Sequence, residues 1–312
     1  MTILVTGSCG QIGTNLSLRL LKEGQQVVGV DNFLTGDREN LEILKNYPHF
    51  TFYEKDIEDP LLKDLLAEYQ FDEVYHLACP TGVPNLVTLA EEMLSATGIG
   101  TKNVLEIAKA KQAKVLIASS SEVYGDPQID IQHEDYTGNV HPVGVRSPYE
   151  EGKRYSEALA AMFFRKYGLD VKIARIFNTF GPFMSKRDQR VIPQFVVQAL
   201  VGEPIIVHGT GTQRRTFLHV EDLLTGLFLI LRNGMAGDVY NIGSDKETTI
   251  KNLANLILHA TGSKSEIRFV ERPTHDHHFR LPDLTKIRNL GWSPKVPLEE
   301  GISLILKEPA KI

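Results

Sequence analysis

Three glycines, Gly7, Gly10 and Gly13, are spaced three residues apart near the start of the chain. A short apolar run, residues 2–6, precedes them, and an amphipathic pattern of helical period, residues 11–22, follows them. Glycines at such a turn let a strand pass directly into a helix that packs closely against it. The chain is therefore expected to begin with a strand–turn–helix unit, the first part of an α/β fold.

The following residues repeat this alternation of strand and helix. Short apolar runs occur at 25–31, 51–53, 73–77, 114–118 and 171–177, with helical patterns between them, the longest at 149–166. Within each run the apolar residues are continuous and do not alternate with polar ones, which is typical of parallel strands covered on both faces. We predict an α/β fold with a Rossmann-type, doubly wound parallel sheet.

The pattern becomes less regular after residue 178. Helices are predicted at 191–200, 220–231 and 250–260, and short strands at 205–207, 239–241 and 267–270. We expect residues 1–178 to form the dinucleotide-binding domain and residues 179–312 to form mainly a smaller substrate-binding lobe. This lobe is expected over the carboxyl ends of the sheet, and some of its segments are expected to return to the main sheet.

An acidic residue, Asp31, ends the second predicted strand, 18 residues after Gly13. A carboxylate at this place accepts hydrogen bonds from ribose hydroxyls, while the helix that follows the glycine turn binds a pyrophosphate at its N-terminus. A carboxylate also repels a 2′-phosphate, so the sequence favours NAD over NADP. The predicted cofactor contacts are Gly7, Gly10, Gln11, Ile12, Gly13, Asp31, Asn32, Asp56, Ile57, Leu77, Ala78, Tyr149 and Lys153.

A second group of residues indicates chemistry beside the cofactor. Tyr149 and Lys153 are four residues apart and so share one face of a predicted helix. An ammonium near a phenol lowers the phenol pKa from about 10 toward working pH. A serine hydroxyl at 119–121, where the fifth strand ends, completes a set suited to proton transfer during hydride transfer from an alcohol.

Four stretches resemble the extended short-chain dehydrogenase/reductases that modify nucleotide sugars, and above all the UDP-glucuronate decarboxylase family. They are residues 76–80, 121–127, 136–154 and 174–182, of which 139–146 (Asn-Val-His-Pro-Val-Gly-Val-Arg) is quite specific to that family. The resemblance implies that Tyr149 is the base, Lys153 its activator and Ser120 the hydroxyl partner. Glu122 is implied as an acid beside C4 and C5 of the sugar, and the predicted substrate contacts are Asn178, Arg190, Gln194, Arg215 and Arg280.

The reaction implied by the resemblance is oxidation of the sugar at C4, loss of CO₂ and re-reduction to UDP-xylose. Residues 81–90 depart from the family pattern, because Gly82 and Leu86 stand where the family has Ser and Tyr; likewise, Thr97 replaces an Asn and Phe183 an Arg. A UDP-sugar or uronate 4-epimerase and a sugar-nucleotide 4,6-dehydratase therefore stay open as alternatives. A non-catalytic NAD-binding regulator is a third alternative, which the intact Ser120, Tyr149 and Lys153 set disfavours.

Composition and charge limit the kinds of partner that the protein is expected to bind. The net charge is −5 with no basic stripe, which does not indicate a nucleic acid or a membrane surface, and no apolar run approaches the roughly 18 residues of a membrane span. Cys9 and Cys79 have no metal-site spacing, and the adjacent ligands of residues 275–278 (His-Asp-His-His) rarely converge on one ion, so no metal is expected. We expect a cytoplasmic protein. The resemblance implies a homodimer, paired through residues 86–110 and 149–166.

Overall fold

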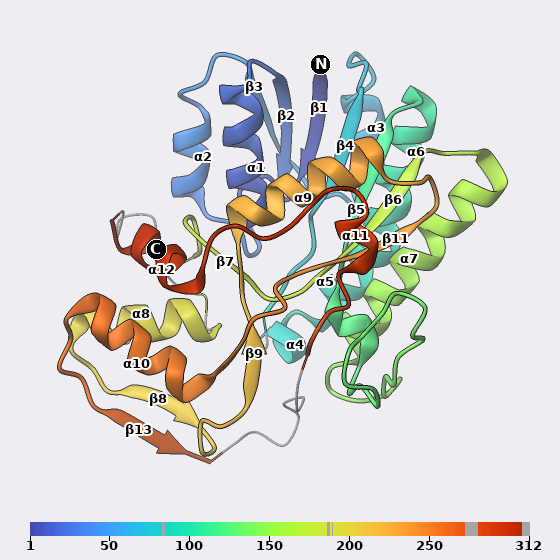
Figure 1. The fold of residues 1–312 in the computed structure, drawn as a ribbon. Helices are drawn as coiled ribbons and strands as arrows, with labels where there is room; N and C mark the ends of the chain where they lie inside the picture. The colour runs from blue at the N-terminus through green and yellow to red at the C-terminus, as the bar shows by residue number, and fades with distance from the viewer. Residues whose placement is uncertain (83–84, 186–187, 189, 272–279, 308–312) are drawn as a thin grey trace.

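The computed structural model describes residues 1–82, 85–185, 188, 190–271 and 280–307. A parallel sheet lies at its centre, with seven strands in the order β11-β6-β5-β4-β1-β2-β3 (Figure 1). These strands are β1 (Thr2–Thr6), β2 (Gln26–Asp31), β3 (Phe50–Glu54), β4 (Glu73–His76), β5 (Lys114–Ser120), β6 (Val171–Ile176) and β11 (Val239–Ile242). The predicted fold class, a Rossmann-type parallel α/β sheet, is thereby confirmed.

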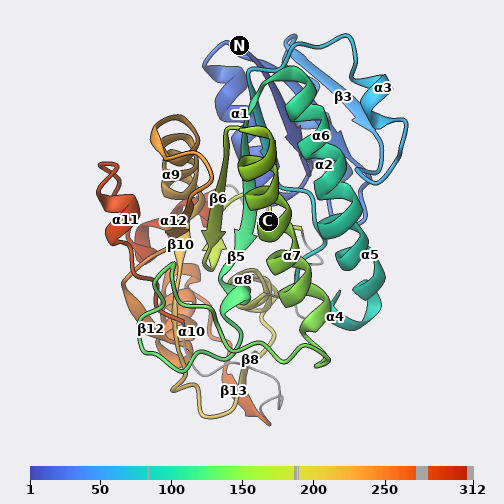
Figure 2. The same ribbon diagram turned by 90° about the vertical axis from the view of Figure 1, so that its right-hand side faces the viewer.

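Helices cover both faces of this sheet (Figures 1 and 2). One face packs against α1 (Gln11–Lys22), α2 (Arg38–Leu44) and α9 (Val220–Asn233). The other packs against α3 (Leu62–Leu65), α6 (Thr101–Lys111) and α7 (Ser147–Tyr167). In β1, Ile3 and Val5 enter the first core and Leu4 the second, because successive side chains of a strand point to opposite faces. Both faces are thus buried, which explains the continuous apolar runs.

The strand order reverses beside β1, because the chain goes from β1 outward to β2 and β3 and then returns to place β4 on the other side. In open α/β sheets, ligands bind in the crevice outside the carboxyl ends of the strands at such a point. The glycine turn follows β1 at this edge, and Leu77 and Ala78 follow β4. A Cβ on Gly7 would come within 2.8 Å of the Ala78 nitrogen, so the two segments lie in direct contact.

Between β4 and α6, the chain forms three consecutive helical segments, α4 (Asn85–Thr88), α5 (Ala90–Ser95) and η1 (Ala96–Gly100). The segment η1 is a single π-helical turn, which widens the helix between α5 and α6. The sequence pattern indicated helix here but not the π turn. The 3-10 helix η2 (Ser121–Tyr124) follows β5 and carries Glu122.

A second, smaller core lies beyond the carboxyl ends of the sheet (Figure 1). It is built by α8 (Val191–Val201), α10 (Ile250–Thr261), α12 (Leu298–Lys307), β8 (Ile205–His208) and β13 (Ile267–Val270). Two small strand pairs, β7 (Thr179–Phe180) with β10 (Leu218–His219) and β9 (Arg214–Thr216) with β12 (Glu247–Thr249), were not predicted, and α11 (Thr285–Arg288) precedes α12. Both β11 and α9 belong to the main sheet and its covering layer although they follow residue 178.

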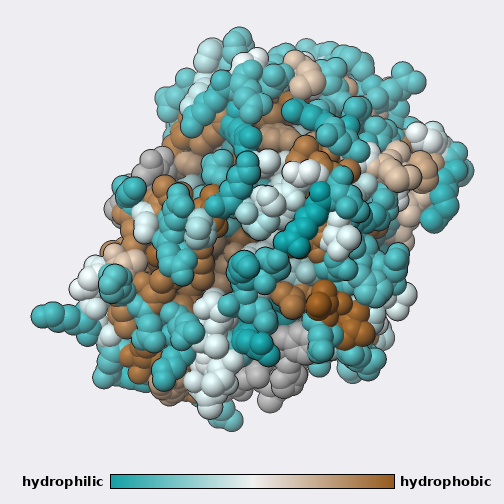
Figure 3. Space-filling model, viewed as in Figure 1, coloured by the Kyte–Doolittle hydropathy of each residue, from teal (hydrophilic) through white to brown (hydrophobic). Residues whose placement is uncertain are grey.

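The surface seen in Figure 3 is mostly polar, with apolar side chains in separate patches. Among the described residues, no helix has both the length and the apolar character that crossing a membrane requires.

Candidate active site

The glycine turn has the close packing that its sequence predicts. Gly7 has a left-handed backbone, with φ of +70°, and its carbonyl accepts a hydrogen bond from the Gly10 nitrogen at 3.2 Å. A Cβ on Gly13 would lie only 2.0 Å from the Gly7 carbonyl oxygen, so no larger residue fits there. Gly10 caps α1 without a side chain, which leaves the first N–H groups of this helix facing an open cleft. Such a turn fits a pyrophosphate.

Asp31 ends β2 beside this turn. Its carboxylate accepts hydrogen bonds from the backbone N–H groups of Cys9 at 2.9 Å and Phe33 at 2.8 Å. Burial raises the pKa of Asp31, and these hydrogen bonds oppose the rise. Asp56 lies near it at the end of β3 and accepts a hydrogen bond from the Asn32 side chain at 2.7 Å. Acceptors at the ends of two neighbouring strands fit the hydroxyls and base of a nucleoside.

A cleft of about 530 Å³ lies along the carboxyl ends of the strands. It is lined by every predicted cofactor contact, namely Gly7, Gly10, Gln11, Ile12, Gly13, Asp31, Asn32, Asp56, Ile57, Leu77, Ala78, Tyr149 and Lys153. The predicted Ser120, Glu122, Asn178 and Arg190 line the same cleft. The structure thus brings together residues from both parts of the chain, 1–178 and 179–312.

The catalytic helix α7 begins at Ser147 and Pro148, where a proline at the first turn costs no hydrogen bond. Lys153 extends from it to donate a hydrogen bond to the Ala118 carbonyl at 2.7 Å, and its nitrogen lies 5.8 Å from the centre of the Tyr149 ring. Tyr149 and Ser120 share a hydrogen bond. The three side chains therefore meet where β5 ends and α7 begins.

The pKa of Tyr149 differs from the sequence-based expectation. Burial raises it above the ordinary value of 10, a neighbouring Cys79 thiol adds to the rise, and the Ser120 hydrogen bond opposes it. We expected the Lys153 ammonium to lower this pKa. In the structure the ammonium is bound to the Ala118 carbonyl, and the desolvation of the phenol outweighs the nearby positive charges.

Glu122 lies at the centre of a buried charge cluster beside this set. Its carboxylate pairs with the guanidinium of Arg146 and, at 3.1 Å, with that of Arg280. Arg146 also pairs with Glu150 of α7 at 3.1 Å. Sequence reasoning missed Arg146 as a site residue, although it ends the quoted Asn-Val-x-Pro-x-Gly-x-Arg motif that precedes Tyr149.

Three predicted substrate contacts do not line the cleft. Arg280 is buried and donates to the backbone carbonyls of Ser121 and Gly125, so it holds the η2 turn and Glu122. Arg215 lies on β9, where it donates to the Arg214 carbonyl at 2.9 Å, and Gln194 lies in the first turn of α8.

The two predicted substrate contacts inside the cleft are already hydrogen bonded. Arg190 is held by both carboxylate oxygens of Asp188 and donates to the Gln11 side chain of the glycine turn at 3.1 Å. Asn178 donates to the Thr216 carbonyl at 3.2 Å. Both residues stand between the cofactor end of the cleft and the C-terminal part of the chain.

Residues 275–278, considered above as metal ligands, lie outside the described residues. Elsewhere in the described part of the chain, no three His, Cys, Asp or Glu side chains are placed to hold a metal ion.

Three features of the site define the class of protein: a glycine turn at the switch point of a parallel sheet, an acidic residue that ends the second strand, and a Tyr/Lys pair facing a serine. This class is the Rossmann-type enzymes that use a dinucleotide to oxidise and reduce an alcohol carbon. The sequence profile described as GDP-mannose 4,6 dehydratase matches residues 4–305, and the chain belongs to that family.

Known proteins similar to the chain act on nucleotide sugars. The chain is 41% identical over 302 residues to UDP-glucuronic acid decarboxylase 1 from Danio rerio. This match covers 96% of this chain and 71% of that protein. UDP-glucose 4-epimerase from Thermotoga maritima, solved with UDP-glucose, is 29% identical with a TM-score of 0.91, covering 100% of this chain and 99% of that chain. UDP-glucuronic acid 4-epimerase from Bacillus cereus, solved as a mutant with NAD and UDP-4-deoxy-4-fluoro-glucuronic acid, is 27% identical with a TM-score of 0.88, covering 97% of each chain.

Proposed function

We propose that the protein is an NAD-dependent UDP-glucuronate decarboxylase that forms UDP-xylose. The observation that carries this proposal is the meeting of Tyr149, Ser120 and Lys153 in the dinucleotide cleft, in a chain 41% identical to a decarboxylase of UDP-glucuronic acid. NAD is the cofactor: the glycine turn and Asp31 hold its pyrophosphate and ribose. When bound, it accepts hydride from C4 of the sugar and later returns it.

Each side chain of the set has a proposed task. Tyr149 takes the proton of the C4 hydroxyl, and Ser120 donates its one hydroxyl proton in a hydrogen bond to the same oxygen. Lys153 holds the Tyr149 face of α7 against the end of β5 through its hydrogen bond to the Ala118 carbonyl. The resulting 4-keto sugar is a β-keto acid, which loses CO₂ because the C4 carbonyl accepts the electrons of the broken bond. The enolate that remains takes up a proton from water at C5, and Tyr149 returns its own proton to the C4 oxygen as C4 is re-reduced.

The cluster of Glu122, Arg146 and Arg280 is proposed to face C4 and C5 of the sugar, where the carboxylate is lost. Two guanidinium groups bind the Glu122 carboxylate and orient it. In this proposal Arg280 acts through Glu122 and the η2 turn, while Arg190 and Asn178 bind the diphosphate end of the substrate. Gln194 and Arg215 stay as proposed substrate contacts.

A second candidate, 4-epimerisation of a UDP-sugar, is favoured by one feature of the cleft. Leu86 lines it where the decarboxylase family has a tyrosine, so a hydroxyl donor is missing there. The structural similarity to UDP-glucose 4-epimerase, with a TM-score of 0.91, supports the same candidate. Epimerisation needs the same oxidation and re-reduction at C4 but no loss of carbon.

Incubation of the purified protein with UDP-glucuronate, without added NADH, separates the candidates. Decarboxylation releases CO₂ and gives a product lighter by that mass, which co-elutes with UDP-xylose. An isomer of unchanged mass indicates an epimerase, and a loss of water from UDP-glucose or dTDP-glucose indicates a dehydratase. If the protein binds NAD but turns over none of these sugars, the proposal is contradicted. The non-catalytic NAD-binding regulator is then the alternative that remains.

We also propose a homodimer in the cytoplasm. The helices α5 to α6 and α7 lie side by side (Figure 2), and they expose Leu94, Ile99 and Tyr155 by 50%, 55% and 55%. Apolar side chains exposed together on neighbouring helices favour pairing with a second copy of this face. Two free thiols, Cys9 and Cys79, support a reducing compartment.

A further inference from the structure

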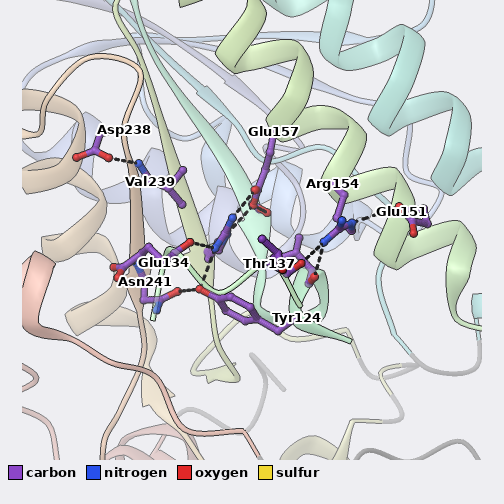
Figure 4. A network of polar contacts seen from close by, with 12 residues as sticks. Tyr124, Glu134, Thr137, Glu151, Arg154, Glu157, Asp238, Val239 and Asn241 are labelled. Carbon is purple, nitrogen blue, oxygen red and sulfur yellow. Dashed lines mark hydrogen bonds and ion pairs between the residues drawn. The ribbon is translucent and has the colours of Figure 1, made fainter. Parts of the chain in front are cut away.

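A buried ion pair that the proposed mechanism does not use lies beneath the catalytic helix. It joins Glu157 of α7 to Arg175 of β6, and both side chains are 12% exposed. Figure 4 shows Tyr124 of η2 and Asn241 of β11 in the same network of polar contacts as Glu157 of α7. A buried pair of charges is costly unless its hydrogen bonds are satisfied, so its contacts are informative.

Glu157 occupies the same helix face as the catalytic pair. It follows Lys153 by four residues and Tyr149 by eight, and side chains at this spacing lie one above the other. Its carboxylate accepts a hydrogen bond from the Ser119 hydroxyl at 2.5 Å. Ser119 directly precedes Ser120 at the end of β5, so Glu157 ties the catalytic helix to the strand that carries the hydroxyl partner.

Arg175 binds both oxygens of this carboxylate, through Nε at 2.9 Å and Nη2 at 2.8 Å. Its remaining nitrogen, Nη1, donates to the Tyr124 hydroxyl at 3.0 Å and to the Glu134 carbonyl at 2.8 Å. The Tyr124 hydroxyl donates in turn to Asn241 at 2.7 Å. Tyr124 ends the η2 turn on which Glu122 lies, so the guanidinium also ties this turn to the pair.

We infer that Glu157 and Arg175 are positioning residues, which set the distance of Tyr149 on α7 from Ser120 and Glu122 on the β5–η2 segment. The two halves of the catalytic set come from separate elements, and the planar, bidentate pair is a side-chain contact that touches both, in addition to the hydrogen bond from Lys153 to the Ala118 carbonyl. Neither residue lines the cleft, so they act only through others. This inference rests on the proposed function of Tyr149 and Ser120.

The test compares wild type, Glu157→Gln, Arg175→Lys and the double variant. Glutamine keeps the shape of Glu157 without its charge. Lysine keeps the charge of Arg175 but lacks the planar guanidinium group that binds both carboxylate oxygens. Each single variant should lower kcat by roughly 10- to 100-fold, because small displacements of reacting groups have effects of this size. KM and the Kd for NAD from calorimetry should stay within about threefold, and the alkaline limb of the kcat–pH profile should shift. The double variant should have a kcat only slightly lower than that of either single variant, because both substitutions break the same ion pair.

The matched control is a second Arg–Glu pair on the same sheet, away from the cleft. Glu73 of β4 binds Arg232 of α9 at 2.9 Å, and the Glu73 side chain is 6% exposed. Glu73→Gln should lower the thermal unfolding temperature while kcat and its pH profile stay unchanged. If Glu157→Gln behaves in the same way, the pair is merely structural and the inference is overturned.

Failure of the proposed function is recognised separately, from the wild type. If wild type turns over none of the sugars, crystal structures of wild type and Glu157→Gln decide the matter. Loss or displacement of the Tyr149–Ser120 hydrogen bond in the variant supports the inference, and an unchanged hydrogen bond overturns it.

Discussion

Burial raises the pKa of the Tyr149 phenol above the usual value for tyrosine. The groups that oppose this rise are a hydroxyl, Ser120, and a cation, Arg190. Lys153, whose ammonium is bound to a carbonyl, lies 5.8 Å from the ring centre. If Tyr149 is the base, as proposed, its ionisation has to be favoured by the bound cofactor and substrate.

Tyr149→Phe should remove turnover and leave cofactor binding intact. The change deletes the hydroxyl that takes the proton, which contributes roughly 10²- to 10⁴-fold to the rate, but it keeps the ring and its packing. Turnover is measured on UDP-glucuronate, and NAD binding by calorimetry. Turnover equal to wild type would contradict the assigned role of Tyr149.

The buried His76 is expected to make the free energy of unfolding depend on pH. Its ring is buried between the hydroxyls of Thr6 and Thr101, at 2.8 and 3.1 Å, and burial, aided by the charge of Lys153, lowers its pKa to about 3. The unfolded chain, with the ordinary histidine pKa of 6.5, binds more protons between pH 6.5 and 3. Stability from this residue is complete above pH 6.5 and falls as pH drops through that window.

The expected slope from His76 alone is about 1.4 kcal/mol of unfolding free energy per pH unit. Urea unfolding of wild type and His76→Gln at several pH values measures it, and the difference between the two curves should shrink as pH falls. Parallel curves would show that His76 does not titrate as described.

At the scale of elements, the first strand–turn–helix unit depends on the space between two glycines. A methyl group on Gly13 would lie 2.0 Å from the Gly7 carbonyl oxygen, whereas one on Gly10 meets the same oxygen at an ordinary 3.5 Å. The start of α1 therefore cannot keep its place against β1 if position 13 carries a side chain.

Gly13→Ala should lower the free energy of unfolding by about 3 kcal/mol, the upper end of overpacking effects, and abolish NAD binding. Gly10→Ala, its matched control, should change the unfolding free energy by less than about 1 kcal/mol, since its Cβ has room. Thermal and urea unfolding measure both variants. Equal stabilities would mean that the turn is not as tight as described.

Sequence patterns predicted the elements whose residues interact locally. The apolar runs of the main strands and the 3.6-residue period of α7, α8, α9 and α10 gave bounds within about two residues of those observed. The π turn of η1 and the pairs β7–β10 and β9–β12 were missed. Strands of two or three residues have no period to read, and a π turn depends on the packing of its neighbours.

In the candidate site, too, local sequence patterns predict some features and miss those that depend on contacts between distant parts of the chain. The glycine turn and the spacing of Tyr149 and Lys153 are local patterns, so the cleft could be located from the sequence. The place of Arg280 beside Glu122 depends on a contact between residues 158 positions apart, which no local pattern reveals. For the same reason, Arg175 was quoted as part of a motif, but its pairing with Glu157 was not foreseen.

At the scale of the whole molecule, the proposed dimer makes a prediction of its own. Ile99 lies on η1 and is 55% exposed, and its chain neighbour Gly98 packs against the ring of Tyr155 on α7. Ile99→Glu would place a charge in the middle of the proposed interface and should shift the protein to a monomer in light scattering. Lys22→Glu, a change at an exposed site of α1 on the opposite face of the sheet, should leave the dimer intact. A monomeric wild type would refute the dimer.

The final strand of the sheet, β11, enters it only after the chain has passed through α8 and β8 of the second core. A fragment that stops at residue 178 would leave β6 with an open edge and would uncover the sheet face that α9 shields. We expect such a fragment to aggregate, because unpaired edges and bare apolar faces recruit other chains. A ribosome making this protein must therefore synthesise about three quarters of it before the nucleotide-binding half can complete its fold.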